Sequence, residues 1–256
     1  MIRNYLLLII VILLYGCSEQ ASSIFSQDID GSAAKFEDDT HGTYNSTYRP
    51  LSSENIIIKN AIIFDGNGNK LENTEIHFSD GLIQAIGQEL VAEGAEVIDA
   101  SGKYITPGII DIHSHMGVYP APSVRTSSDG NEATNPVTAE VWAEHSVWSQ
   151  DPQYKLALAG GVTTFHVLPG SANLFGGRGV TLKNVSSNTV PDMKFPNAPH
   201  SLKMACGENP KRVYSSRGPS TRMGNVAGYR QAWIEAENFK NSCLLYTSPS
   251  PRDLST

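Results

Sequence analysis

The sequence predicts a mixed α/β protein with two differently built parts. Short β-branched runs separated by Gly-Asn and Asp-Gly turn signals fill residues 54–103, which is typical of a small antiparallel sheet. Beyond residue 104, apolar runs with strand character are interspersed with segments of helical periodicity. The two patterns indicate a sheet module followed by a larger α/β module.

Composition excludes some classes of function. The 256 residues carry a formal net charge of -7, which argues against a nucleic-acid partner because phosphate binding needs a basic face. The three cysteines, Cys17, Cys206 and Cys243, are too few and too scattered for a disulfide framework. No CxxC pair is present for a cysteine-based zinc site.

The first 17 residues predict export. Arg3 precedes an apolar run over residues 5–14 that is too short for a comfortable membrane span, the layout of a secretory signal. Leu14-Tyr15-Gly16-Cys17 resembles a bacterial lipobox, which implies lipidation of Cys17 and attachment to a membrane. Ser18 after the cysteine favours the outer membrane facing the periplasm, and the alternative is an ordinary signal peptide. The polar residues 18–53 then predict a flexible tether.

Four strands are expected in the first module. They cover residues 56–64, 75–78, 82–86 and 97–100, and the turn signals Asp65-Gly66-Asn67-Gly68 and Ser79-Asp80-Gly81 separate the first three. The short turns predict antiparallel pairing.

Residues 104–115 form the stretch on which the second module depends. Pro107-Gly108 is a turn signal, and the isoleucines at 109, 110 and 112 predict a short, fully buried strand. His113 and His115 are two residues apart at its end, so a strand would direct both imidazoles to one side. Two imidazoles can supply two ligands of a divalent first-row metal ion, whereas the alternative is a pair of satisfied histidines.

Residues 106–115 resemble the first barrel strand of the amidohydrolase superfamily, and the resemblance extends over about residues 55–241. Its imidazolonepropionase-like branch is the most similar. The resemblance implies an incomplete (β/α)8 barrel over 104–242 and the N-terminal part of a β-sandwich over 54–103. It also implies that His113 and His115 bind a metal ion, commonly Zn²⁺, and that Lys203 bridges to a second ion as a carbamate, with Glu208 as the rival ligand.

Further helices and strands are expected in the rest of the second module. A helix is expected over residues 138–149 with Thr138 as N-cap, and a further helical turn over 154–159. A strand is expected at 161–170, and residues 174–182 are expected to form a tight turn that leads into another strand. Residues 200–210 resemble the fourth strand of the barrel and the loop after it. His166 is interpreted as a hydrogen-bonded core histidine in preference to a pocket residue. Apolar residues recurring every three or four positions predict an amphipathic helix over 225–240.

The end of the chain departs from the resemblance. Only about four of the eight strands of a barrel can be placed, and the aspartate expected as a catalytic group would lie beyond this sequence. Residues 243–256 resemble translated cloning sequence more than protein, so we expect a non-native tail. A half barrel leaves unpaired edges, and we therefore expect an inactive chain that aggregates or forms a homo-oligomer.

The resemblance implies a metal-dependent hydrolase that cleaves carbon–nitrogen bonds other than ordinary peptide bonds. Small molecules with cyclic amide or imidazolone-like groups are the expected substrates, and one or two ions, most commonly Zn²⁺, the expected cofactor. Two alternatives stay open at this point. One is a periplasmic dipeptidase, and the other is a lipoprotein that keeps the barrel for binding without catalysis.

Overall fold

The computed structural model describes residues 43–50 and 54–247. The predicted signal peptide with Cys17, most of the predicted tether and residues 248–256 of the predicted tail lie outside the described residues. Within the described part of the chain, no helix is both long and apolar enough to span a bilayer.

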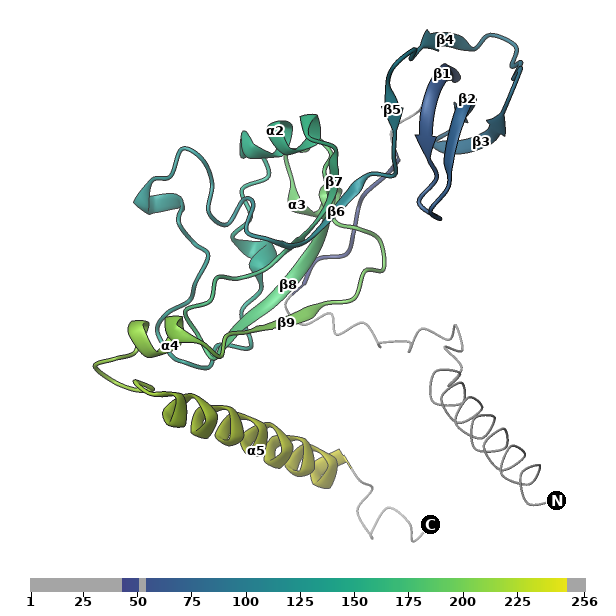
Figure 1. Ribbon diagram of the computed structural model, residues 1–256. Helices are drawn as coiled ribbons and strands as arrows, with labels where there is room; N and C mark the ends of the chain where they lie inside the picture. The colour runs from purple at the N-terminus through teal and green to yellow at the C-terminus, as the bar shows by residue number, and fades with distance from the viewer. Residues whose placement is uncertain (1–42, 51–53, 248–256) are drawn as a thin grey trace, which may run out of the picture. The chain divides into compact units, whose positions relative to one another are not determined.

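The first module is a single sheet in the part of the chain that the structure describes. It comprises β1 (Ile56–Phe64), β2 (Lys70–Ser79), β3 (Leu82–Gly87), β4 (Glu96–Asp99) and β5 (Tyr104–Ile105). The strand order is β3-β2-β1-β4, and β5 also pairs with β1 (Figure 1). The β1–β2 turn forms because the Asp65 carboxylate accepts hydrogen bonds from the backbone N–H groups of Asn67 and Asn69, at 2.8 and 3.1 Å. The hydrophobic core of the sheet consists of Ala61, Ile63, Ile76 and Ala100.

The expected antiparallel pairing is confirmed for β1–β2 and β2–β3 but is wrong for β4, and β5 is a strand that the sequence did not predict. Both β4 and β5 run parallel to β1. The reason is topological: after β3, residues 88–95 carry the chain to the opposite edge of the sheet, so that β4 arrives beside β1 in the same direction.

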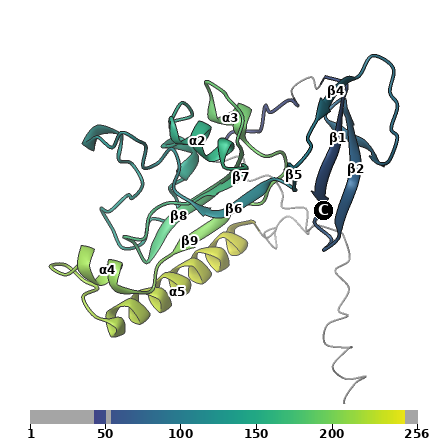
Figure 2. The same ribbon diagram turned by 45° about the horizontal axis from the view of Figure 1, so that its top comes forward.

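The second module contains a four-stranded sheet with the order β6-β7-β8-β9 (Figure 2). Its strands are β6 (Ile109–Ser114), β7 (Val162–Val167), β8 (Phe175–Lys183) and β9 (Ser201–Met204). β6 and β7 are parallel, as in a barrel, but β7–β8 and β8–β9 are antiparallel. Only residues 168–174 join β7 to β8, which is too short for the crossover that parallel neighbours require. The sheet is therefore a mixed half-barrel.

The helices of this module are short except for the last. They are η1 (Arg125–Ser127), η2 (Ala143–His145), α2 (Gln153–Ala159), α3 (Val190–Met193), α4 (Glu208–Val213) and α5 (Arg222–Thr247). α2 and α5 confirm two predicted helices, and α5 extends into the region predicted as a non-native tail. The predicted helix over 138–149 is wrong: only the 3-10 turn η2 forms there. Thr138 donates its N–H to Phe175 O at 2.8 Å instead of capping a helix, because this segment lies alongside β8.

The strands of the second sheet differ in how far their side chains are buried. β7 and β8 carry a core of Phe165, Val167, Val180 and Leu182, all at most 2% exposed. The strand β6 forms as predicted, but the expectation that it is fully buried is wrong, since Ile112 is 76% exposed. β6 is the edge strand of the described sheet, and within the described residues nothing covers its isoleucines.

The tether predicted over 18–53 is wrong for residues 43–48. Tyr44 N–H donates to Glu144 Oε1 at 3.0 Å, and Thr47 N–H donates to Pro191 O at 3.0 Å. Lys194 also donates to the carbonyl of Tyr44. Polar composition predicts flexibility only where backbone groups have no fixed partners, and here the η2 and α3 segments supply them.

Candidate metal-binding site

The structure brings three predicted site residues together from both edges of the second sheet. Lys203, on β9, places its Nζ 3.0 Å from Nε2 of His113 at the end of β6. The imidazole of His115 lies beside that of His113, with 5.3 Å between the centroids of the two rings. Ninety positions in sequence separate His113 from Lys203, so their contact depends on the curvature of the sheet between β6 and β9.

An irregularity in β6 helps to orient His113. Asp111 pairs with Phe165 in β7, yet Ser114 pairs with Val167, so the register shifts by one residue between them. Such a shift transfers the following side chains to the other face of a sheet. Ser114 shares the face of its partner Val167, so the neighbouring His113 points to the other face of the sheet, opposite the buried Phe165 and Val167.

The ring of His115 is held by the backbone. Its Nδ1 lies 2.8 Å from the carbonyl oxygen of Leu168. A carbonyl can only accept, so Nδ1 carries the hydrogen and Nε2 keeps the lone pair that a metal ion needs. Tyr119 packs edge-on against the same ring at 5.6 Å between centroids. The loop after β6, which the sequence predicts to line the site, thus contributes an aromatic side chain beside His115.

Charge is disfavoured at the contact between Lys203 and His113. Lys203 is only 8% exposed, and burial lowers the pKa of its amine. The nearby positive charge of Lys203 is the main cause that lowers the pKa of His113, with burial as a second cause. Each effect favours a neutral nitrogen with an available lone pair.

The rival candidate ligand, Glu208, contacts a different residue. Its carboxylate pairs with Lys211 within α4, 2.8 Å from that ammonium group, and this hydrogen bond is the main cause that lowers the pKa of Glu208. The side chain is 69% exposed. The structure therefore brings Lys203, and not Glu208, to the two histidines. Cys206 is an exposed free thiol, and Cys17 lies outside the described residues.

The donor set is two imidazoles and one amine. Among the described residues, no group of three or more His, Cys, Asp or Glu side chains gathers in a way that could hold a metal ion. Of these three residues, His113 is exposed, His115 is half-buried and Lys203 is buried.

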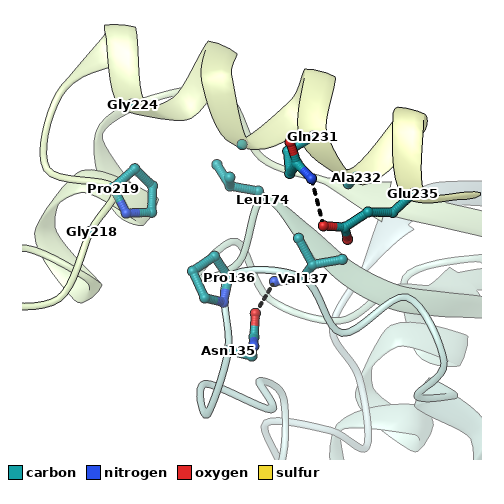
Figure 3. A pocket seen from close by; sticks show the side chains of 11 residues that line it. Asn135, Pro136, Val137, Leu174, Gly218, Pro219, Gly224, Gln231, Ala232 and Glu235 are labelled. Atoms are coloured by element: carbon teal, nitrogen blue, oxygen red, sulfur yellow. Dashed lines mark hydrogen bonds between the residues drawn. The ribbon is translucent and has the colours of Figure 1, made fainter.

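A separate cavity of about 500 Å³ lies between α5 and the segment around Pro136 (Figure 3). Leu174 and the helix residues Gly228 and Ala232 line it, and Gln231 donates a hydrogen bond to Glu235 at its edge, at 2.8 Å. None of His113, His115 and Lys203 is among its lining residues. The cavity is therefore distinct from the histidine–lysine contact.

Comparison with known proteins identifies similar chains, although no family model matches the sequence. An amidohydrolase of Hapsidospora irregularis is 32% identical over 225 residues, which is 75% of this chain and 22% of that protein. A dihydroorotase of Caldanaerobacter subterraneus is 37% identical over 81 residues, 30% of this chain and 19% of that protein. The crystal structure of an amidohydrolase from Thermotoga maritima MSB8 matches with a TM-score of 0.69 and 40% identity, over 74% of this chain and 49% of that one. This chain thus spans less than half the length of each of these relatives.

Proposed function

We propose that this chain, for which these relatives support membership of the amidohydrolase superfamily, carries the first part of the active site of a metal-dependent hydrolase. The proposed reaction is cleavage of carbon–nitrogen bonds in small cyclic amides or imidazolone-like rings. Similarity to a dihydroorotase supports this substrate class, and the motif over residues 106–115 supports the imidazolonepropionase-like branch. The observation that carries the proposal is the 3.0 Å contact between Lys203 Nζ and His113 Nε2.

The chemistry of the donor set fits a divalent metal ion. Nε2 of His115 has its lone pair available because Nδ1 is engaged by the Leu168 carbonyl. Nε2 of His113 faces the lysine amine from the neighbouring position. Imidazole nitrogens suit Zn²⁺, so we propose that His113 and His115 hold one such ion. When bound, Zn²⁺ would lower the pKa of a water molecule toward about 7 and polarise the scissile carbonyl.

Lys203 has a proposed role of its own. Burial favours its neutral amine, which can add to CO₂ to form a carbamate with release of one proton. The resulting carboxylate-like oxygens would provide the ligands that two imidazoles alone do not, and would allow a second ion. Because the chain spans less than half of its relatives, we propose that the remaining catalytic groups, including the expected aspartate, lie outside these residues and that the chain alone is inactive.

Titration of the chain with Zn²⁺ tests the proposal. We expect the wild-type chain to bind Zn²⁺ and His113→Asn or His115→Asn to weaken binding by at least about tenfold, since each removes a ligand. His77→Asn is the matched control, because His77 lies on β2 in the other sheet, where it bonds Asn55 Oδ1 at 2.7 Å. Equal affinities for His113→Asn and His77→Asn would refute the site.

We further propose that Cys17 is lipidated and anchors the protein at the outer membrane, facing the periplasm. The lipobox-like sequence Leu14-Tyr15-Gly16-Cys17 supports this. Several acyl chains would anchor the protein stably, because each buried CH₂ contributes about 0.8 kcal/mol. Cys17→Ser should move the protein from the membrane fraction to the soluble fraction, and an unchanged distribution would contradict the anchor.

A further inference from the structure

His166 forms a hydrogen-bonded chain across three strands of the second sheet. Its Nδ1 lies 3.0 Å from Thr181 Oγ1 on β8, and its Nε2 lies 2.6 Å from Ser201 Oγ on β9. β7 and β9 are not neighbours, since β8 runs between them (Figure 2). The bond between His166 and Ser201 therefore passes over β8.

The register places this chain on the same face as the metal-binding candidates. His166 is opposite Thr181, and Ser201 is opposite Gly179, two residues from Thr181. Alternate residues of a strand share a face, so Ser201 and Lys203 point to the same side of β9. Ser201 is thus one step along the strand face from the lysine that meets His113.

Gly179 is what leaves room for the crossing. A Cβ atom there would lie 2.6 Å from Ser201 Oγ and 2.7 Å from Leu168 Cδ2, closer than side-chain atoms approach. Any larger residue at position 179 would displace the serine hydroxyl from the imidazole. The absence of a side chain at residue 179 thus permits a link between two strands that share no backbone hydrogen bonds.

The partners suit a neutral imidazole. A neutral ring has one N–H donor and one acceptor nitrogen, and each hydroxyl can serve as either donor or acceptor. Burial lowers the pKa of His166, and the positive charges of His113 and His200 act in the same direction. Both ring nitrogens are occupied by Thr181 and Ser201, so the ring is suited to hold its neighbours rather than to bind an ion.

We infer that His166 is a positioning residue that holds Ser201, and through it the strand β9, in the register that sets Lys203 against His113. This inference adds a positioning residue to the proposed function. It rests on that proposal only for the role of Lys203 in metal binding. Its structural content, the placement of Lys203, can be measured without any metal.

Two replacements of His166 separate its two contacts. Gln reaches to about the position of Nε2 and can keep the bond to Ser201, whereas Asn reaches only the position of Nδ1 and can keep the bond to Thr181. Ser201→Ala removes the cross-strand hydroxyl while leaving the histidine in place. We expect His166→Asn and Ser201→Ala to release Lys203, and His166→Gln to preserve its position.

The first measurement is acetylation of individual lysines by limiting acetic anhydride, followed by peptide mass spectrometry of the full chain. Lys203 in the wild-type chain should react more slowly than the exposed Lys155, because it is 8% exposed. His166→Asn and Ser201→Ala should raise the Lys203 rate several-fold, to about that of Lys155, as burial is lost. The buried Lys194 controls for unfolding, since it lies in the same module but outside this hydrogen-bonded chain.

The second measurement is Zn²⁺ titration of the same variants. Loss of an outer partner of a metal site lowers affinity by about 10- to 100-fold, which we expect for His166→Asn and Ser201→Ala but not for His166→Gln. Failure of the wild-type chain to bind Zn²⁺ would refute the proposed function and leave the acetylation result to decide the inference. The positioning role of His166 is refuted if Ser201→Ala leaves the acetylation rate of Lys203 unchanged. It is also refuted if Ser201→Ala raises the acetylation rates of Lys203 and Lys194 equally.

Discussion

The two sheets of this protein treat their polar side chains in different ways. In the first sheet, His77 on β2 bonds Asn55 beside the start of β1, and the pair Lys70–Glu72 lies within one strand. In the second sheet, His113, His166 and Lys203 come from three different strands to one face. The first sheet pairs these polar groups two by two, whereas the second gathers three basic nitrogen groups whose pKa values are all lowered, an arrangement that is common at functional sites. The comparison supports placing the proposed metal-binding site on the second sheet.

The largest expected effect is on the free energy of unfolding, when an ion pair of one module is compared with an ion pair of the other. Glu144 and Lys194 form a buried pair at 2.5 Å, with side chains 1% and 9% exposed. Glu144→Ala should lower the free energy of unfolding by about 3–5 kcal/mol, because it leaves a buried ammonium group uncompensated. Urea denaturation followed by circular dichroism measures this loss. The matched control Glu72→Ala removes an exposed partner of Lys70 and should leave the midpoint unchanged. Equal effects of the two variants would break the contrast.

The next largest effect on stability is expected when glycines in strands of the two sheets are replaced by alanine. Gly179→Ala should destabilise the protein by about 1–3 kcal/mol, because the added methyl group collides with Ser201 and Leu168. A Cβ at Gly87, on β3, would meet Leu90 Cδ2 at an ordinary 3.6 Å. Gly87→Ala should therefore be neutral or slightly stabilising in the same denaturation experiment. A neutral Gly179→Ala would show that β8 and β9 can separate without loss.

A smaller effect concerns pH. The pKa of His113 is lowered in the folded chain, mainly by Lys203, so the unfolded chain binds more protons in the range just below the unfolded value of about 6.5. The stability associated with His113 is fully present above that value and is lost as the pH falls through the folded pKa. The free energy of unfolding should consequently decline more steeply on acidification in the wild-type chain than in His113→Asn. Parallel curves for the two proteins would contradict the coupling.

The smallest expected effect distinguishes the two candidate ligands. Glu208→Gln should leave Zn²⁺ affinity unchanged, because its carboxylate is exposed and paired with Lys211. Lys203→Met keeps an unbranched side chain one atom shorter but removes the amine, and should weaken Zn²⁺ binding in a titration that contains bicarbonate as a source of CO₂. A loss confined to Glu208→Gln would reverse the assignment.

Local patterns were enough to predict several elements correctly. The turn signals around Asp65 and Asp80 predict the hairpins β1–β2 and β2–β3, because each turn is built from neighbouring residues. The failures are non-local. Residues 138–149 have helical periodicity, yet their backbone groups bond to β8, and the direction of β8 follows from the length of the connection at 168–174. The burial expected of β6 also failed, because burial depends on what covers a strand.

The sequence by itself identified the candidate metal-binding residues: the pair His113 and His115, and Lys203 as the partner implied by family resemblance. Only the tertiary structure decided that Lys203 rather than Glu208 meets the histidines, and that His166 links β7 to β9 over Gly179. The physical reason is that residue type and spacing along one strand specify a face, whereas the distance between strands depends on register shifts and on the space left by a missing side chain.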